Sequence, residues 1–328
     1  MRPQFRWLLA AFVSGGCLAT IAIETLAQAY PARPVRLVVP YAPGGLPDTM
    51  SRIIGHRVGE ALGQQFVIEN RPGAGGIAGC EAVAKAAPDG YTLLIADVGQ
   101  LAINPALYSK LSYDPMRDFT PVSLAGIAPI FLAVSVSVPV NSLAELIKFA
   151  KANPGRLTYG SSGTGSIHHL NMEALKSGVG IDLVHVPYKG AGQSIPALVA
   201  GQVSMVPAAL PALTAHIKAG KVKLLAVNTQ KRSAQAPDVP TVAEVTGLAD
   251  YHYPAEIGVL ATAGTPKAIV DRLSAEIAKA VRHPDTVQRF TNLGIEIVGG
   301  TPEEYAAIMR SGLEKYAKVV KAAKVKID

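Results

Sequence analysis

Three segments of the sequence place glycines and small polar residues between an apolar run and a helix-forming run, at 37–48, 157–166 and 186–192. A helix N-terminus exposes unpaired N–H groups and carries roughly half a positive charge. Glycines let a ligand approach the backbone closely. Each segment is therefore a candidate site for an anion such as a carboxylate. The candidate ligand contacts are Tyr41, Pro43, Gly44, Gly45 and Asp48 in the first segment, and Ser161, Ser162, Thr164, Gly165, Ser166 and nearby His168 in the second.

The basic residues of these segments are few. None of the three contains an arginine, and only the third contains a lysine, Lys189. We therefore expect backbone N–H groups and hydroxyls to neutralise a bound anion, without a bidentate arginine. A Schiff-base role for Lys189 is disfavoured against a surface or hinge lysine.

The second segment also invites enzymatic interpretations. A phosphate-binding P-loop requires a Gly-Lys-Ser/Thr ending, but 160–166 has no lysine. A nucleophile elbow requires Gly-x-Ser-x-Gly, and Thr164 stands where its last glycine should be. A serine hydrolase that pairs Ser161 or Ser162 with His168 stays open as an alternative, but we assign no catalytic residue.

Metal and thiol chemistry have little support. His168 and His169 are adjacent, so a helix would point them about 100° apart, which makes a poor metal pair. Cys80 lies in a helix-like run and is expected to be a small buried hydrophobe. Once a leader is removed it is the one cysteine left, so no internal disulfide forms. We expect no metal and no cofactor.

The composition excludes several classes of protein. Of 328 residues 49% are hydrophobic and 17% charged, with 31 glycines and 24 prolines, as in a turn-rich globular chain. The net charge is +7, but the basic residues are scattered among acids. The densest lysine run, 315–326, shares its segment with an apolar helical stripe and indicates a solvated helix face. We expect no binding of nucleic acid.

The first 29 residues have the pattern of a secretory signal peptide. Arg2 and Arg6 precede a mostly apolar stretch at 7–23, and Ala27-Gln28-Ala29 forms an A-x-A cleavage signature. The apolar stretch is shorter than the ~20 residues that span a bilayer. We therefore expect cleavage before Tyr30 and a periplasmic protein.

Strand and helix patterns alternate through the rest of the chain, which predicts an α/β fold with mostly parallel sheets. Helix starts are predicted at Ser142, Thr241, Thr265-Pro266 and Thr301 from their capping patterns. The predicted strands are 35–40, 66–69, 91–96, 130–136, 157–159, 183–186, 203–206, 224–227 and 257–261.

The order of several motifs resembles the Bug, or TctC-like, family of extracytoplasmic solute receptors. Among them are Glu-Asn-Arg-Pro-Gly-Ala-Gly-Gly at 69–76, Pro-Asp-Gly-Tyr-Thr-Leu-Leu at 88–94 and Tyr-Gly-Ser-Ser-Gly-Thr-Gly-Ser at 159–166. Further matching stretches lie at 30–36, 39–48, 102–105, 185–190, 217–220 and 263–266.

This resemblance implies a periplasmic-binding-protein type II fold, in which two α/β lobes enclose an interlobe ligand cleft. It implies a first lobe of 30–130 and 254–328 and a second lobe of 131–253. The implied protein is a monomeric receptor that delivers a small carboxylate to membrane transporter subunits. A ligand sensor without a transport role stays open as a second alternative.

Two stretches depart from the family pattern and add candidate contacts. Asp97 and Gln100 stand where many relatives have small hydroxyl residues, and Ala208 stands where many have an acid or Asn. An ionised Asp97 would repel a bare carboxylate by about 4 kcal/mol at ~4 Å and a dielectric of 20. Either Asp97 caps the following helix, or it recognises an amino- or ring-nitrogen-bearing acid in the place left by Ala208 and Ala209.

Overall fold

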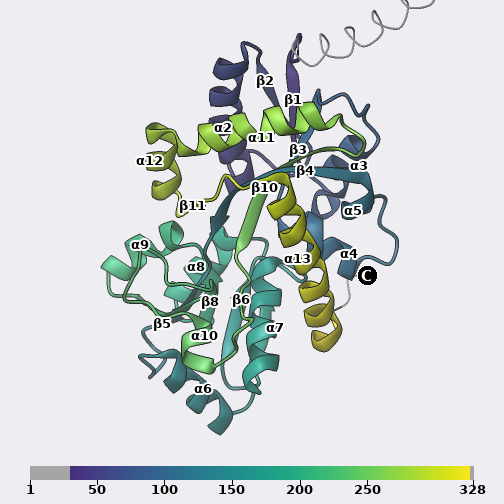
Figure 1. Ribbon diagram of the computed structural model, residues 1–328. Coiled ribbons are helices and arrows are strands. Elements are labelled where there is room, and N and C mark those ends of the chain that lie inside the picture. The colour runs from purple at the N-terminus through teal and green to yellow at the C-terminus, as the bar shows by residue number, and fades with distance from the viewer. Residues whose placement is uncertain (1–29, 326–328) are drawn as a thin grey trace, which may run out of the picture.

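The computed structural model describes residues 30–325, which form two α/β lobes, each built on one sheet (Figure 1). The first lobe holds a six-stranded sheet in the order β11-β4-β10-β3-β1-β2. Its strands are β1 (Val35–Val39), β2 (Phe66–Asn70), β3 (Thr92–Ala96), β4 (Phe119–Ala128), β10 (Ala255–Thr262) and β11 (Glu296–Ile297). The predicted signal peptide lies outside the described residues.

The second lobe holds a five-stranded sheet in the order β7-β6-β8-β5-β9. Its strands are β5 (Phe131–Ser135), β6 (Thr158–Ser161), β7 (Val184–Pro187), β8 (Met205–Ala208) and β9 (Val222–Val227). Its helices are α6 (Leu143–Ala152), α7 (Ile167–Val179), α8 (Ala191–Val199), α9 (Leu210–Lys218) and α10 (Val242–Thr246).

The remaining helices belong to the first lobe or extend from it. They are α2 (Leu46–Leu62), η1 (Ala74–Gly76), α3 (Ile77–Ala84), η2 (Gly99–Ile103), α4 (Asn104–Leu107), α5 (Pro115–Asp118), α11 (Lys267–Arg282), α12 (Pro284–Asn292) and α13 (Pro302–Ala323). Within residues 30–325, no helix has the length and apolar character needed to cross a membrane.

The sheets are mixed, so the prediction of mostly parallel sheets was wrong. β1 pairs in parallel with β2 and β3, and β6 pairs in parallel with β7 and β8. Two strands at the points where the chain passes between the lobes are antiparallel to their neighbours. β10 is antiparallel to β3 and β4, and β5 is antiparallel to β8 and β9. Because the chain leaves the first sheet at the end of β4 and returns to the same edge at the start of β10, these two strands run in opposite directions.

The two lobes are joined by short crossings and by α13. The chain passes from β4 to β5 between Ala128 and Phe131, and it returns before β10. In Figure 1, α13 runs from the first lobe down beside α7 of the second. Tyr316, Val319 and Val320 of α13 share a core cluster with side chains of α7. The lobe boundaries at 130 and 254 stay predictions, because this helix packs on both lobes.

Most predicted helix starts match the structure. Thr241 and Thr301 each form a full capping box, and the Ser142 hydroxyl accepts the N–H of Glu145. Thr265 was predicted wrongly as a cap. Helix α11 begins at Lys267, and the Thr265 hydroxyl instead donates to the carbonyl of Thr262 at 2.8 Å.

Candidate functional site

The predicted loops of both lobes lie at the sheet edges from which the chain crosses. β1 and β3 are parallel, so the loops that follow Val39 and Ala96 share one edge of the first sheet. Ala128, where β4 ends, pairs with Ala255 at the start of β10, and Gly258 pairs with Ala96 at that same edge. In the second sheet the start of β5 pairs with the end of β8, so the loops after β6 and β8 also face the crossing. The topology therefore brings the predicted segments of the two lobes toward one another.

The first loop, 40–45, is shaped by Asp48. Gly44 has φ 93°, a left-handed conformation that favours glycine. Its N–H donates to Asp48 at 2.9 Å, and the same carboxylate accepts from Arg52 at 2.9 Å and from Asn70 at 2.8 Å. These hydrogen bonds lower the pKa of Asp48 against the effect of its burial, which acts to raise it. Asp48 is 3% exposed, and its hydrogen bond with the Gly44 N–H stabilises the loop from the buried side. Direct ligand contact by Asp48 stays a prediction.

Asp97 directly follows β3, and its carboxylate accepts hydrogen bonds from within the protein. The Tyr41 hydroxyl donates to both carboxylate oxygens at 2.8 Å, and the Gly99 N–H donates to one of them at 2.7 Å. Burial raises the pKa of Asp97, and these two donors act in the opposite direction. The residue at the N-cap of η2 is Val98, which has no side-chain cap, so both the predicted capping role of Asp97 and its contact with a ligand stay predictions. Gln100 is similarly engaged, because its amide donates to the Gly75 carbonyl at 3.1 Å.

The second loop, 161–166, has one exposed hydroxyl. Ser161 is 1% exposed, and its Oγ lies 2.6 Å from Nε2 of His185. Ser162 Oγ lies 2.8 Å from Nδ1 of His168, and the Ser166 hydroxyl caps α7. Thr164 is exposed. Of the hydroxyls predicted to face a ligand, Ser161 is thus directed inward, and the others stay predictions.

Free backbone donors occur in both loops. Within residues 30–325, the N–H groups of Gly45, Ser162 and Thr164 donate no hydrogen bond to the protein. Gly45 precedes the first turn of α2, and Thr164 lies two residues before the Ser166 cap of α7. These N–H groups are the backbone donors expected for an anion site. Gly165 differs, because its N–H is used by Nδ1 of His169 at 3.0 Å.

Ala208 ends β8 beside the crossing, and α9 follows it. Ala208 is 1% exposed and pairs with Phe131, the first residue of β5. Its side chain is a methyl group and carries no polar atom. Contact between Ala208 and a ligand stays a prediction.

Asn228, which the sequence analysis did not select, ties the two crossings together. Its Oδ1 accepts the Ile130 N–H at 2.9 Å, and its Nδ2 donates to Asn171 at 3.0 Å and to the Tyr253 carbonyl at 2.5 Å. Asn228 is 4% exposed. The sequence offered one indication of this role, because Asn228 comes directly after a buried strand. Its hydrogen-bond partners could not be predicted, because they are distant in the sequence.

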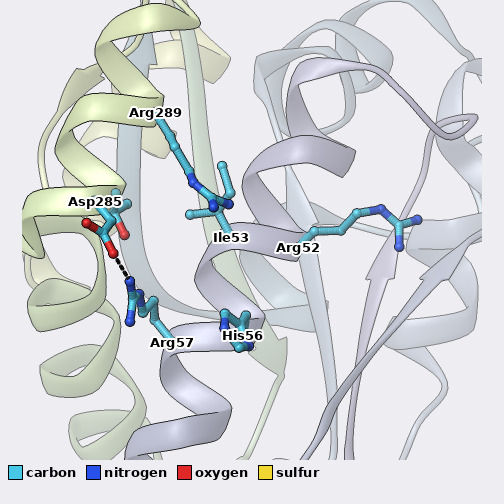
Figure 2. Close-up of a pocket in the computed structure, with 7 residues that line it drawn as sticks. Arg52, Ile53, His56, Arg57, Asp285 and Arg289 are labelled. Atoms are coloured by element: carbon cyan, nitrogen blue, oxygen red, sulfur yellow. Dashed lines mark hydrogen bonds and ion pairs between the residues drawn. The ribbon is translucent and has the colours of Figure 1, made fainter.

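Predicted site residues do not line the larger cavities found among the described residues. Figure 2 shows one of about 270 Å³ between α2 and α12. Its charges are largely compensated: Arg57 pairs with Asp285 and Glu60, while Arg52 points away and pairs with Asp48. Its lining is Arg52, Ile53, His56, Arg57, Asp285, Thr286 and Arg289. The predicted interlobe cleft stays a prediction.

Groups suited to metal or thiol chemistry are not assembled in the described part of the chain. No set of three or more His, Cys, Asp or Glu side chains within 30–325 is placed to hold a metal ion. Burial raises the pKa of Cys80 to about 12, so its thiol stays protonated. Burial also lowers the pKa of His168 to about 4, which makes it a weak base toward Ser162.

The chain is similar in sequence and in structure to known proteins. The chain is 40% identical, over 94% of its length and 92% of the relative, to the UPF0065 protein in the tcbD–tcbE intergenic region of Pseudomonas sp. strain P51. It resembles the solved structure of Rpa4515 from R. palustris with adipate, with a TM-score of 0.78, 37% identity, and coverage of 90% of this chain and 99% of that one.

A second solved structure, MatC (Rpa3494) from Rhodopseudomonas palustris with bound malate, matches with a TM-score of 0.74 and 34% identity, covering 89% of this chain and all of that one. The model of the tripartite tricarboxylate transporter family receptor, TctC, matches residues 50–325. The predicted family resemblance is confirmed: this chain belongs to the TctC family of tripartite tricarboxylate transporter receptors.

Proposed function

We propose that this chain is a periplasmic receptor that captures a small carboxylate between its lobes and passes it to a membrane transporter. The observation that carries the proposal is the set of unpaired N–H groups at Gly45, Ser162 and Thr164. They belong to loops of different lobes, so a ligand with two acceptor groups can be held by both. Relatives with bound adipate and malate support a dicarboxylate.

The receptor has no catalytic activity in this proposal. Ser161 is directed inward, and the His168 beside Ser162 has its pKa lowered to about 4 by burial. A serine hydrolase needs an accessible nucleophile and a base that titrates near neutral pH. The export signal at 1–29 and cleavage before Tyr30 belong to the same proposal, as does a monomeric state.

A thermal-shift screen over mono- and dicarboxylates, run beside an esterase assay, tests the proposal. A ligand at a hundredfold excess over Kd adds about 2.7 kcal/mol to the free energy of unfolding. We expect at least one dicarboxylate to raise the Tm and no ester to be turned over. No shift with any acid, together with ester hydrolysis that is lost in Ser162→Ala, contradicts the proposal and supports the enzyme.

A further inference from the structure

The second loop rests on a stack of aromatic rings inside the second lobe. The imidazoles of His169 and His185 are 3.9 Å apart and almost parallel, at 7°. The ring of Tyr159 lies 4.9 Å from His185 on the same stack. The three rings come from α7, β7 and β6, so the stack joins the elements on both sides of the loop.

Each imidazole holds one end of the loop. At the start, Nε2 of His185 lies 2.6 Å from Ser161 Oγ, which also accepts the Gly163 N–H at 3.1 Å. At the other end, Nδ1 of His169 accepts the Gly165 N–H at 3.0 Å. Gly163 and Gly165 have φ 127° and 76°, so these bonds fix a loop conformation that glycine permits.

We propose that His169 and His185 are positioning residues that preset the 161–166 loop for ligand binding. They do so as a stacked pair of neutral imidazoles. The ligand part of this inference rests on the proposed function, whereas the ordering of the loop does not depend on it.

The hydrogen bond from Gly165 determines the tautomer of His169. Because Nδ1 accepts a hydrogen bond, it carries no proton, and the ring is neutral with its proton on Nε2. Burial lowers the pKa of His169, and burial with the neighbouring His169 lowers the pKa of His185 to about 4. Among the charged groups nearby, Glu173 acts to raise both pKa values and Lys176 acts to lower them.

Two substitutions of His169 separate the hydrogen bond from general packing. His169→Asn keeps an acceptor near the position of Nδ1, and His169→Leu removes it. We expect His169→Leu to speed hydrogen exchange of the Gly165 amide and to weaken malate binding, each about tenfold, with His169→Asn within about threefold of the wild type. His56→Leu, at a histidine whose side chain is 69% exposed on α2, is the control and should change neither value.

A nitrogen spectrum supplies a readout that packing alone does not move. At pH 7 the Nδ1 resonance of His169 should be that of an unprotonated nitrogen. Any of three results overturns the inference: a protonated Nδ1, unchanged hydrogen exchange of the Gly165 amide in His169→Leu, or equal effects of His169→Leu and His169→Asn.

If His169→Leu does not fold, a second variant keeps the inference testable. His185→Phe keeps the ring stack and removes the bond to Ser161, and we then expect faster hydrogen exchange of the Gly163 amide. A wild type that binds no carboxylate but shows the expected exchange contradicts only the proposed function.

Discussion

Asp48 and Asp97 show how acidic side chains can stand beside a site proposed for an anion. Each carboxylate accepts hydrogen bonds from the protein: Asp48 from Gly44 and Arg52, and Asp97 from Tyr41 and Gly99. These donors favour the charged form of each carboxylate, although burial still raises the pKa of Asp97 while that of Asp48 is lowered. The scarcity of basic residues in the loops predicts that backbone N–H groups hold the ligand.

Asp97→Asn tests which interpretation of Asp97 holds. Both carboxylate oxygens of Asp97 accept a hydrogen bond from Tyr41, and one also accepts from Gly99. Because these oxygens are engaged within the protein, we expect the affinities for succinate and for its amino analogue aspartate to change by the same factor. Calorimetric titration of both ligands against both proteins measures this. A selective loss of about tenfold for aspartate would show instead that Asp97 recognises an amino group.

At the scale of elements, β5 and β10 beside the crossings were predicted from the sequence, whereas β4 was not. β4 was absent from the predicted strands because Pro121 and Gly126 lie within it, and both residues disfavour strand interiors. Its register against β10 shifts twice, which accommodates this irregularity. The capped helices and the short buried strands were predictable, because caps and apolar runs act locally. The partners of Asn228 and the His169–His185 stack were not, since they join residues far apart in the chain.

The crossing should depend strongly on Asn228. Asn228→Ala leaves the Ile130 N–H and the Tyr253 carbonyl without this side-chain partner, and we expect the free energy of unfolding to fall by about 2–4 kcal/mol. Urea denaturation measures the loss. Asn292→Ala, at an exposed residue of α12, is the matched control and should cost less than about 0.5 kcal/mol. Equal losses in the two variants would refute this role.

At the scale of the whole molecule, Glu256 links stability to pH where the returning strand meets α13. It lines a cavity of about 140 Å³ together with Lys315 and Tyr316 of that helix. Burial raises its pKa from 4.5 to about 7, although Lys315 acts to lower it. Between these values the folded chain retains a proton that the unfolded chain has lost. Stability from this group is therefore present at low pH and falls as pH rises.

Glu256→Gln should remove that dependence. Between pH 5 and pH 8 we expect the free energy of unfolding of the wild type to fall by about 3 kcal/mol more than that of the variant. Denaturation curves across this range measure the difference. Glu60→Gln, at a side chain that is 53% exposed, serves as the control and should follow the wild type. Parallel curves for the wild type and Glu256→Gln would contradict the assignment.

The most direct test of capture between the lobes is an amide NMR titration with malate and adipate. We predict that the N–H resonances of Gly45, Ser162 and Thr164 shift together and share one saturation curve for at least one of these acids. Shifts confined to one lobe, or no shift of these three amides while the acid binds elsewhere, would contradict it.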